Sequence, residues 1–364
     1  MPVGMRWWQP GQTYSFTAWY GCTRRTSTGP YRPSQMPGRR RDDAIDSAGE
    51  GPRHESHGRR EGGHDEHVVG ATGSEFPIRV ESHVLIIVVL VSASIDPAKN
   101  YETLIVERAG GVVTITFNRP TSKNSVNGVM WVELIEVLNE IQHNGDDRVV
   151  VFTGAGNEFC SGADLSSIGS REGQTKARQH GHYYYSMREV STAILAIHRL
   201  PQPTIAKVRG VAVGVGCNIA FGCDLVAASD NARFSEIFSK RGLSLDGGGS
   251  WILPRRIGMH KAKELAFFAD ILTAQEADRF GLLNKVLPDA ELDAFVAEWC
   301  ERLLALPPIA LAQSKRMLNN AMQVTMEEAL DDEGIAQSVN FSTKDTAEAI
   351  TAWIQKRVPI FKGR

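Results

Sequence analysis

Phe159-Cys160-Ser161-Gly162-Ala163-Asp164-Leu165 is the first of two glycine-punctuated stretches that decide the fold of this chain. The second, further along, is Gly210-Val211-Ala212-Val213-Gly214-Val215-Gly216-Cys217-Asn218. Each stretch places small residues where a chain leaves a β-strand and enters a helix, and such a place exposes backbone N–H groups that no helical carbonyl accepts. Two such groups aimed at one point form an oxyanion hole, which stabilises charge developing on a carbonyl oxygen.

Composition divides the 364 residues at Lys99, the first lysine of the chain. Residues 1–98 are rich in Gly, Pro, Ser and His, and the first 83 of them show neither helical nor strand periodicity, so we expect a disordered N-terminal extension. One hypothesis is that translation begins nearer Lys99. We expect a core domain over residues 99–290 and a C-terminal helical subdomain over residues 291–364.

Charge and hydropathy exclude several classes of protein. The formal net charge of −2 shows no basic excess, so we expect no nucleic-acid partner. The longest apolar run, Val84–Val91, is shorter than the roughly 20 residues of a bilayer span, and it only faintly resembles a signal peptide. Four histidines at positions 54, 57, 64 and 67 lack a fixed scaffold, and we expect no metal site.

The five cysteines are odd in number and show no disulfide spacing, which indicates reduced thiols and a cytoplasmic protein. Cys160 and Cys217 lie inside the two glycine-rich stretches, so a catalytic thiol is an alternative. No histidine lies near either one to form a thiolate. We therefore interpret both as small apolar fillers.

Alternating strand and helix patterns predict an α/β fold with a parallel sheet. Gly110-Gly111 should join the first two strands as a hairpin, and Thr273 with Glu276 resembles a capping box. The expected strands are 104–107, 112–117, 148–152, 204–208 and 224–228. Expected helices include one around Met130–Ile141, one over about 173–199, one after the second stretch, and a series over about 260–269, 273–280, 289–305, 308–321, 325–341 and 345–356.

The two stretches can act on a thioester. Gly162 permits a tight turn before Ala163, which is small enough for a ligand carbonyl to approach its N–H. Gly214 and Gly216 do the same around Val215, whose N–H lies at a helix start. The alternative is that such turns only allow close packing.

A base is supplied by Asp246, a lone carboxylate near Leu245, Trp251 and Ile252, followed by three glycines that open a helix. Apolar surroundings raise the pKa of a carboxyl group and make it a stronger base, whereas a helix N-terminus acts in the opposite direction. The alternative is that Asp246 only caps that helix.

Together these residues resemble the crotonase (enoyl-CoA hydratase/isomerase) superfamily, from about Tyr101 to Arg364. Further matching segments are Asn118-Arg119-Pro120 with Asn124, Cys223-Asp224, and Lys356-Arg357 before Pro359 and Phe361. The resemblance implies a crotonase-type spiral of repeated ββα units, a homotrimer or dimer of trimers, and acyl-CoA thioester substrates, with coenzyme A as part of the substrate and no other cofactor. It also implies that the N–H groups of Ala163 and Val215 form the oxyanion hole.

The resemblance further implies which residues contact the substrate. Ser161, Ala163 and Leu165 would lie along the adenine and pantetheine of CoA, and Lys356 would meet a CoA phosphate. The expected catalytic residues are Asp246, Ala163, Val215 and Asn218. The expected substrate-binding residues are Ser161, Gly162, Ala163, Asp164, Leu165, Gly214, Gly216, Phe238, Trp251 and Lys356.

Typical hydratases of the family activate water with two glutamates. The corresponding positions of this chain are Asn218 and Phe238, and neither is a carboxylate. Asp246 is instead similar to the single acid of an isomerase branch. We therefore expect a shift of a carbon–carbon double bond, with Asn218 orienting substrate or water and Phe238 keeping the pocket dry. The alternatives are hydration by Asp246 acting alone on a water, an acyl-CoA-binding module without turnover, and a tail that binds a partner.

Overall fold

The computed structural model describes residues 100–167 and 183–364. All of the described residues belong to one compact unit of the chain. The expected disorder of the extension, the four histidines, the run Val84–Val91 and residues 173–182 of one expected helix lie outside the described residues. Within these residues, no helix combines the length and the apolar character needed to cross a bilayer.

The main sheet has six strands in the order β1-β2-β3-β4-β6-β9. Its first two strands form the antiparallel hairpin expected at Gly110-Gly111, where both glycines have positive φ, and the other pairs are parallel. The parallel sheet is therefore confirmed. The strands are β1 (Leu104–Ala109), β2 (Val112–Phe117), β3 (Val149–Gly154), β4 (Thr204–Val208), β6 (Leu225–Ser229) and β9 (Lys285–Leu287).

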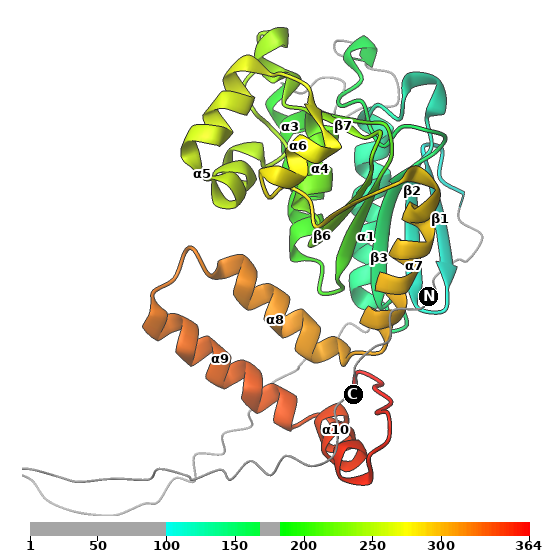
Figure 1. The fold of residues 1–364 in the computed structure, drawn as a ribbon, viewed down its shortest axis with the longest axis vertical. Helices are drawn as coiled ribbons and strands as arrows, with labels where there is room; N and C mark the ends of the chain where they lie inside the picture. Colours follow the sequence, from blue (N-terminus) through cyan, green and yellow to red (C-terminus); the bar gives the residue numbers. More distant parts are fainter. Residues whose placement is uncertain (1–99, 168–182) are drawn as a thin grey trace, which may run out of the picture. The chain divides into compact units, whose positions relative to one another are not determined.

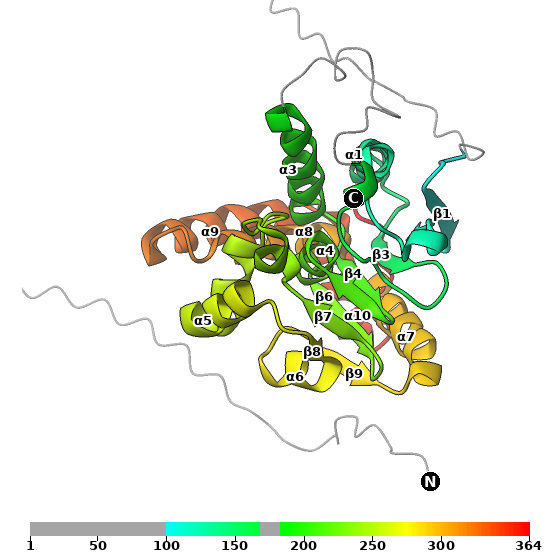
Figure 2. The ribbon, with the colours of Figure 1, turned by 90° about the horizontal axis from the view of Figure 1, so that it is seen from above.

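Helices cover both faces of this sheet, which explains its nearly continuous apolar strands. Three helices, α1 (Gly128–His143), α3 (Tyr183–Arg199) and α4 (Val215–Gly222), lie on one face, and α7 (Leu292–Leu304) lies on the other (Figure 2). In β3, Val150 and Phe152 pack with the first group of helices, and the alternate residues Val149 and Val151 pack with α7. Because successive side chains of a strand point to opposite faces, β3 contributes to two separate apolar cores.

A second, smaller sheet has the order β5-β7-β8, and the sequence analysis did not identify it. Its strands are β5 (Val211–Val213), β7 (Arg233–Ser235) and β8 (Leu272–Thr273). Along the chain, β4 of the main sheet is followed by β5 of the small sheet and by α4, and β6 is followed by β7 and α5 (Gly249–Phe268). This alternation is the ββα repeat that the resemblance implied.

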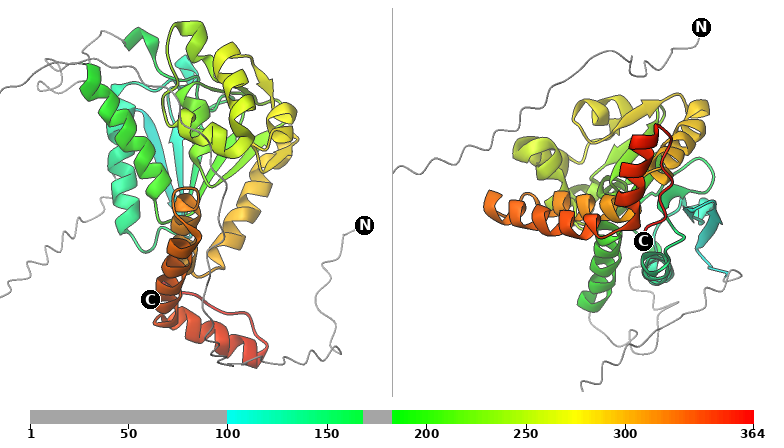
Figure 3. Two further views of the ribbon diagram at one scale, coloured as in Figure 1. Left: turned by 90° about the vertical axis from the view of Figure 1, so that its left-hand side faces the viewer. Right: turned by 90° about the horizontal axis from the view of Figure 1, so that it is seen from below.

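Residues 291–364 are helical, as expected, and the short strand β9 lies before them, within residues 99–290. The division of the chain into these two parts stays a prediction. Gly258 kinks α5 with φ of 73° and ψ of 163°, where the sequence predicted the end of one helix and the start of another. The capping box of Thr273 and Glu276 is present on α6 (Ala274–Arg279). Beyond α7 follow α8 (Pro308–Asn320), α9 (Met326–Phe341) and α10 (Lys344–Gln355); α8 and α9 lie side by side (Figures 1 and 3).

Candidate active site

The two glycine-rich stretches lie side by side and hydrogen-bond as parallel strands. The N–H of Cys160 donates to the carbonyl of Val211 at 2.9 Å, and the N–H of Val213 donates to the carbonyl of Cys160 at 2.9 Å. This pair of bonds makes a parallel bridge between Cys160 and Ala212. Residues distant in sequence are thereby fixed in one register.

The two expected oxyanion donors come directly after the closest contact between the stretches. A Cβ atom on Gly162, the residue before Ala163, would lie 2.8 Å from the carbonyl oxygen of Val213 and 4.0 Å from Cα of Gly214, the residue before Val215. The pairing therefore brings together the two residues that the sequence analysis singled out.

Glycine is required where the stretches meet. Gly162 has φ of +97°, and a Cβ atom on it would lie 2.8 Å from the carbonyl oxygen of Val213. A Cβ atom on Gly216 would lie 2.5 Å from the carbonyl oxygen of Cys160. Both distances are too short for real contacts, so each position requires the absence of a side chain. Close packing was the alternative interpretation of these glycines. The same close packing brings the residues that bear the two N–H donors near each other, so the two interpretations do not exclude each other.

The N–H groups of Ala163 and Val215 have no protein acceptor in the described part of the chain. Val126 donates to the carbonyl of Gly162 and accepts from the N–H of Asp164. These two hydrogen bonds flank the exposed residue Ala163 and do not use its N–H. Val215 is the first residue of α4, where a backbone N–H has no acceptor within the helix. Both donors are therefore available to a ligand.

The Asn118-Arg119-Pro120 segment and Asn124 hold the first stretch in place. The side-chain amide of Asn124 donates to the carbonyls of Ala155 and Glu158 at 2.9 and 2.7 Å. Arg119 forms an ion pair with Asp164 at 2.7 Å. These residues support the loop and do not provide a reacting group.

Two of the expected CoA-binding residues, Ser161 and Asp164, also have protein contacts. Ser161 Oγ donates to the carbonyl of Ser122 at 3.0 Å. Hydrogen bonds from Ser166 and the pair with Arg119 lower the pKa of Asp164, so this carboxylate is already held by the protein. Leu165 is half exposed.

Lys356 is not brought to this loop within one chain. It is the C-cap of α10, is exposed, and lies on a helix that packs against α9. Its expected contact with a CoA phosphate stays a prediction, and it would need a different arrangement of α10 or a second copy of the chain.

Asp246 has the surroundings expected of a base. One carboxyl oxygen, Oδ1, is buried and has no hydrogen-bond partner among residues 100–167 and 183–364, and burial raises the pKa of the group to about 6. The N-cap of α5 is Gly248, and no side chain caps that helix. The alternative that Asp246 only caps the helix is therefore wrong. Its backbone carbonyl, not its carboxyl group, accepts from Gly249 at 3.0 Å.

Phe238 and Asn218 lie where the family's two glutamates were expected, beside the start of α4. Phe238 is 6% exposed, and its ring comes within 3.6 Å of the Cβ position of Gly214, next to the donor of Val215. Asn218 is fully buried, and its side-chain nitrogen donates to the carbonyl of Asp246 at 2.9 Å. An apolar ring therefore lies beside the turn that precedes Val215, and a neutral amide contacts the backbone of Asp246.

Glu236 is a buried acid that the sequence analysis missed. It is 2% exposed, burial raises its pKa to about 8, and Oε2 accepts from the side-chain nitrogen of Asn218 at 3.3 Å. The signal was available, because Glu236 is a lone carboxylate between Phe234 and Phe238, as Asp246 is between apolar neighbours. Asn218 thus donates to the carboxyl group of Glu236 and to the backbone carbonyl of Asp246.

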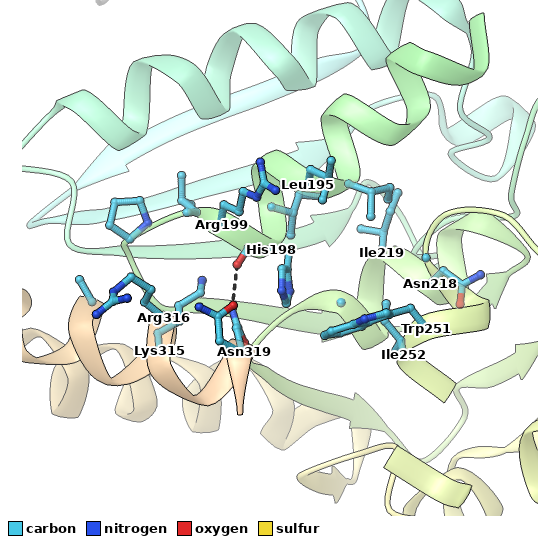
Figure 4. A pocket seen from close by; sticks show the side chains of 18 of the residues that line it. Leu195, His198, Arg199, Asn218, Ile219, Trp251, Ile252, Lys315, Arg316 and Asn319 are labelled. Carbon is cyan, nitrogen blue, oxygen red and sulfur yellow. Dashed lines mark hydrogen bonds between the residues drawn. The ribbon is translucent and has the colours of Figure 1, made fainter. Parts of the chain in front are cut away.

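A cavity of about 930 Å³ opens beside these residues. It begins at Asn218 and at Gly248, two residues after Asp246, and runs between α3 and α8 (Figure 4). The wall next to Asn218 and Gly248, called the near wall below, is apolar and includes Ile194, Ile219, Trp251 and Ile252. Lys315, Arg316 and Asn319 lie at the far end (Figure 4), where Asn319 donates to the carbonyl of His198 at 3.0 Å. Trp251, expected to bind substrate, is thus a cavity wall.

The thiols of the two stretches are inert. Cys160 and Cys217 are buried, and burial raises the pKa of Cys160 to about 12 and that of Cys217 well above its usual value. Both stay protonated near neutral pH, which agrees with their interpretation as apolar fillers. Across residues 100–167 and 183–364, no group of three or more His, Cys, Asp and Glu side chains could hold a metal ion.

Comparison with known proteins explains why these features occur together. The family model described as enoyl-CoA hydratase/isomerase matches residues 107–364, which include every described element of the site. The chain belongs to the enoyl-CoA hydratase/isomerase family. The resemblance to crotonases and the crotonase-type fold are thereby confirmed.

Relatives in the enoyl-CoA hydratase/isomerase family carry both kinds of name. A short-chain-enoyl-CoA hydratase of Clostridium acetobutylicum is 36% identical over 72% of this chain and 98% of its own length. A 1,2-epoxyphenylacetyl-CoA isomerase of Escherichia coli is 34% identical over 70% and 96%. The crystal structure of an enoyl-CoA hydratase from Bacillus anthracis matches with a TM-score of 0.66 and 32% identity, over 72% of this chain and 100% of that chain.

Gly216→Ala tests whether the contact between the two stretches holds the site together. The added methyl group would displace the carbonyl of Cys160, so we expect a loss of about 1–3 kcal/mol in the free energy of unfolding, measured by chemical denaturation, together with weaker acyl-CoA binding. Gly128→Ala is the matched control, because nothing lies within 4 Å of its Cβ position at the start of α1. Equal behaviour of the two variants would contradict the argument.

Proposed function

We propose that this enzyme shifts a carbon–carbon double bond of an enoyl-CoA thioester. The observation that carries the proposal is that two backbone donors without a protein acceptor among the described residues, on Ala163 and Val215, occur with a buried carboxyl oxygen on Asp246, whose neighbour Gly247 lies against the side chain of Val215. Membership of the family supports an acyl-CoA substrate.

The proposed reaction conserves all atoms of the substrate. Asp246, ionised above pH about 6, takes the proton at C2 of a 3-enoyl-CoA, and the electron pair of that C–H bond delocalises onto the thioester oxygen as a dienolate. The N–H groups of Ala163 and Val215 hold this oxygen, and each such donor is worth roughly 3 kcal/mol in comparable sites. Asp246 then returns the proton at C4, which leaves the double bond between C2 and C3.

The walls of the site favour return of the proton to carbon over addition of water. Phe238 stands at one of the two positions where hydratases of this family have a glutamate, and its buried ring offers no acceptor for a water. A carboxyl group with a pKa near 6 suits both halves of the reaction, because it exchanges a proton readily near neutral pH.

Hydration of a 2-enoyl-CoA is the second candidate, and one observation favours it. Asn218 Oδ1 and Asp246 Oδ1 are both buried without a hydrogen-bond partner in the described residues, and two such acceptors could hold one water. The names of several relatives are those of hydratases. Assays of hydration and isomerisation on one preparation distinguish the two reactions.

Asp246→Asn tests the proposed base. The change keeps the size of the side chain and removes its ability to accept a proton, so we expect kcat for 3-hexenoyl-CoA to fall by about 10²- to 10⁴-fold, with little change in KM. In the wild type, kcat should fall as the pH drops through about 6, where Asp246 becomes protonated. Wild-type kcat in the variant would remove Asp246 from the mechanism, and tight acyl-CoA binding without turnover by the wild type would favour a binding module.

Ile194→Phe tests whether the cavity receives the acyl chain. Ile194 lies on α3 at the near wall, 3.5 Å from the Cβ position of Gly248. A larger ring there should lower kcat/KM for a ten-carbon enoyl-CoA about tenfold and leave a four-carbon substrate unaffected. Equal loss for both chain lengths would show that the cavity is not the acyl pocket.

A trimeric or hexameric assembly fits the apolar side chains that the last three helices expose. The most exposed of these belong to α8, α9, α10 and the segments joined to them: Leu318, Met322, Met326, Ile335, Phe341, Trp353, Ile354, Val358 and Ile360. Large exposed apolar patches typically mark interfaces between proteins. The cytoplasmic location stays a prediction.

Light scattering tests the assembly, and we expect a mass of three chains or a multiple of three. Trp353, 81% exposed on α10, should belong to the interface, so Trp353→Glu should yield smaller species. Asp146→Lys, on an exposed loop before β3, should leave the mass unchanged. A monomeric wild type would contradict this part of the proposal.

A further inference from the structure

Three buried side-chain oxygens near the proposed base have no hydrogen-bond partner in the described residues. They are Asp246 Oδ1, Asn218 Oδ1 and Glu236 Oε1. Buried polar atoms are usually paired, so three such atoms on three neighbouring residues point to a functional arrangement. The proposed function uses Asp246 and Asn218 and leaves Glu236 without a role.

The orientation of the Asn218 side chain is decided by its neighbours. Its nitrogen Nδ2 lies 2.9 Å from the backbone carbonyl of Asp246, and a carbonyl can only accept a hydrogen bond. The second hydrogen of the same nitrogen is directed to Glu236 Oε2 at 3.3 Å. Both hydrogens of the amide are therefore used, and flipping the amide would place its oxygen against the carbonyl of Asp246.

The backbone around Asp246 depends on this contact. The carbonyl of Asp246 accepts from Gly249 within its own turn and from Asn218, which belongs to α4. A Cβ atom on Gly249 would lie 2.6 Å from Asn218 Nδ2, so the turn fits closely over the amide. Asn218 thus links α4 to the turn that bears the proposed base, and Glu236 holds Asn218 from the opposite side.

Glu236 can hold the amide without placing a second full charge beside Asp246. The groups facing Glu236 are the Asn218 amide and the Cys217 thiol from α4, and Asp246 from the loop before α5. Burial raises the pKa of Glu236 to about 8, so most of the group is protonated at pH 7, when Asp246 is mostly ionised. A neutral carboxyl group still offers Oε2 as an acceptor.

We propose that Glu236 is a positioning residue for this reaction: its carboxyl group fixes the Asn218 amide, which in turn fixes the turn carrying Asp246. Asn218 lines the cavity between α3 and α8, and Glu236 does not. Glu236 therefore acts through Asn218 and has no contact with the substrate. The inference rests on the proposed function, because it assigns Asp246 as the base.

The first test compares two replacements of Glu236 in the isomerase assay. Glu236→Gln keeps an oxygen that can accept from Asn218, so we expect kcat within about threefold of the wild type. Glu236→Leu is similar in size and accepts no hydrogen bond, so we expect kcat to fall about ten- to a hundredfold, with KM within about threefold. Two results together identify a positioning role: activity is kept in Glu236→Gln, and Glu236→Leu lowers kcat but not KM. A purely structural defect would instead lower the amount of folded enzyme.

The second test is a double-mutant cycle with Asn218→Ala. If Glu236 acts through Asn218, adding Glu236→Leu to Asn218→Ala should change kcat by less than about twofold. Glu133→Gln is the matched control, a buried glutamate on α1 that accepts from Thr103 at 3.0 Å, and it should leave kcat unchanged. Thermal melting of every variant checks that the enzyme assayed is folded.

The outcomes separate this inference from the proposed function. Wild-type kcat in Glu236→Leu, or full multiplication of the two losses in the double variant, would overturn the role of Glu236. Asp246→Asn is assayed alongside: if it is inactive while Glu236→Leu is fully active, only the positioning role fails. If Asp246→Asn retains activity, the proposed base fails whatever the Glu236 variants show.

Discussion

The structure of the site depends on the parallel pairing of two segments through Cys160 and Ala212. This pairing joins two strand-to-helix connections, and it places Gly162, the residue before Ala163, against Val213 and Gly214, which precede Val215. It requires glycine at Gly162 and Gly216, because a side chain at either position would meet a backbone carbonyl. Two sheets make the pairing possible. The main sheet sets the spacing of successive repeats, and β5 of the small sheet lies alongside the segment that contains Cys160.

The buried polar groups of the site lower the stability of the folded protein. An unpaired buried oxygen typically costs about 1–3 kcal/mol, and Asp246, Asn218 and Glu236 each retain one. Burial that raises the pKa of Asp246 to about 6 is the same desolvation that makes the carboxyl group a useful proton carrier near neutral pH. The apolar cores on both faces of the main sheet supply the stability that offsets such local costs.

Much of this arrangement could be predicted from the sequence, because long apolar runs and glycine spacing are local signals. The strands β2 and β4 were placed at their observed bounds, and the capping box at Thr273 was correct. The strands β5 and β7 were missed because three residues are too few to show a period of two. Glu236 was missed although it is a lone carboxylate between Phe234 and Phe238, because the amide that its carboxyl group contacts belongs to α4, and this contact is formed only in the fold. The choice between isomerase and hydratase depends on where a substrate carbon lies relative to Asp246, which no pattern of residues encodes.

A crystal structure with a bound, non-reacting enoyl-CoA analogue would test the central claim most directly. The account predicts that the thioester oxygen lies about 2.7–3.1 Å from the backbone nitrogens of both Ala163 and Val215, with a carboxyl oxygen of Asp246 facing C2 or C4. A thioester oxygen bonded elsewhere, with these two N–H groups directed away from one another, would contradict it.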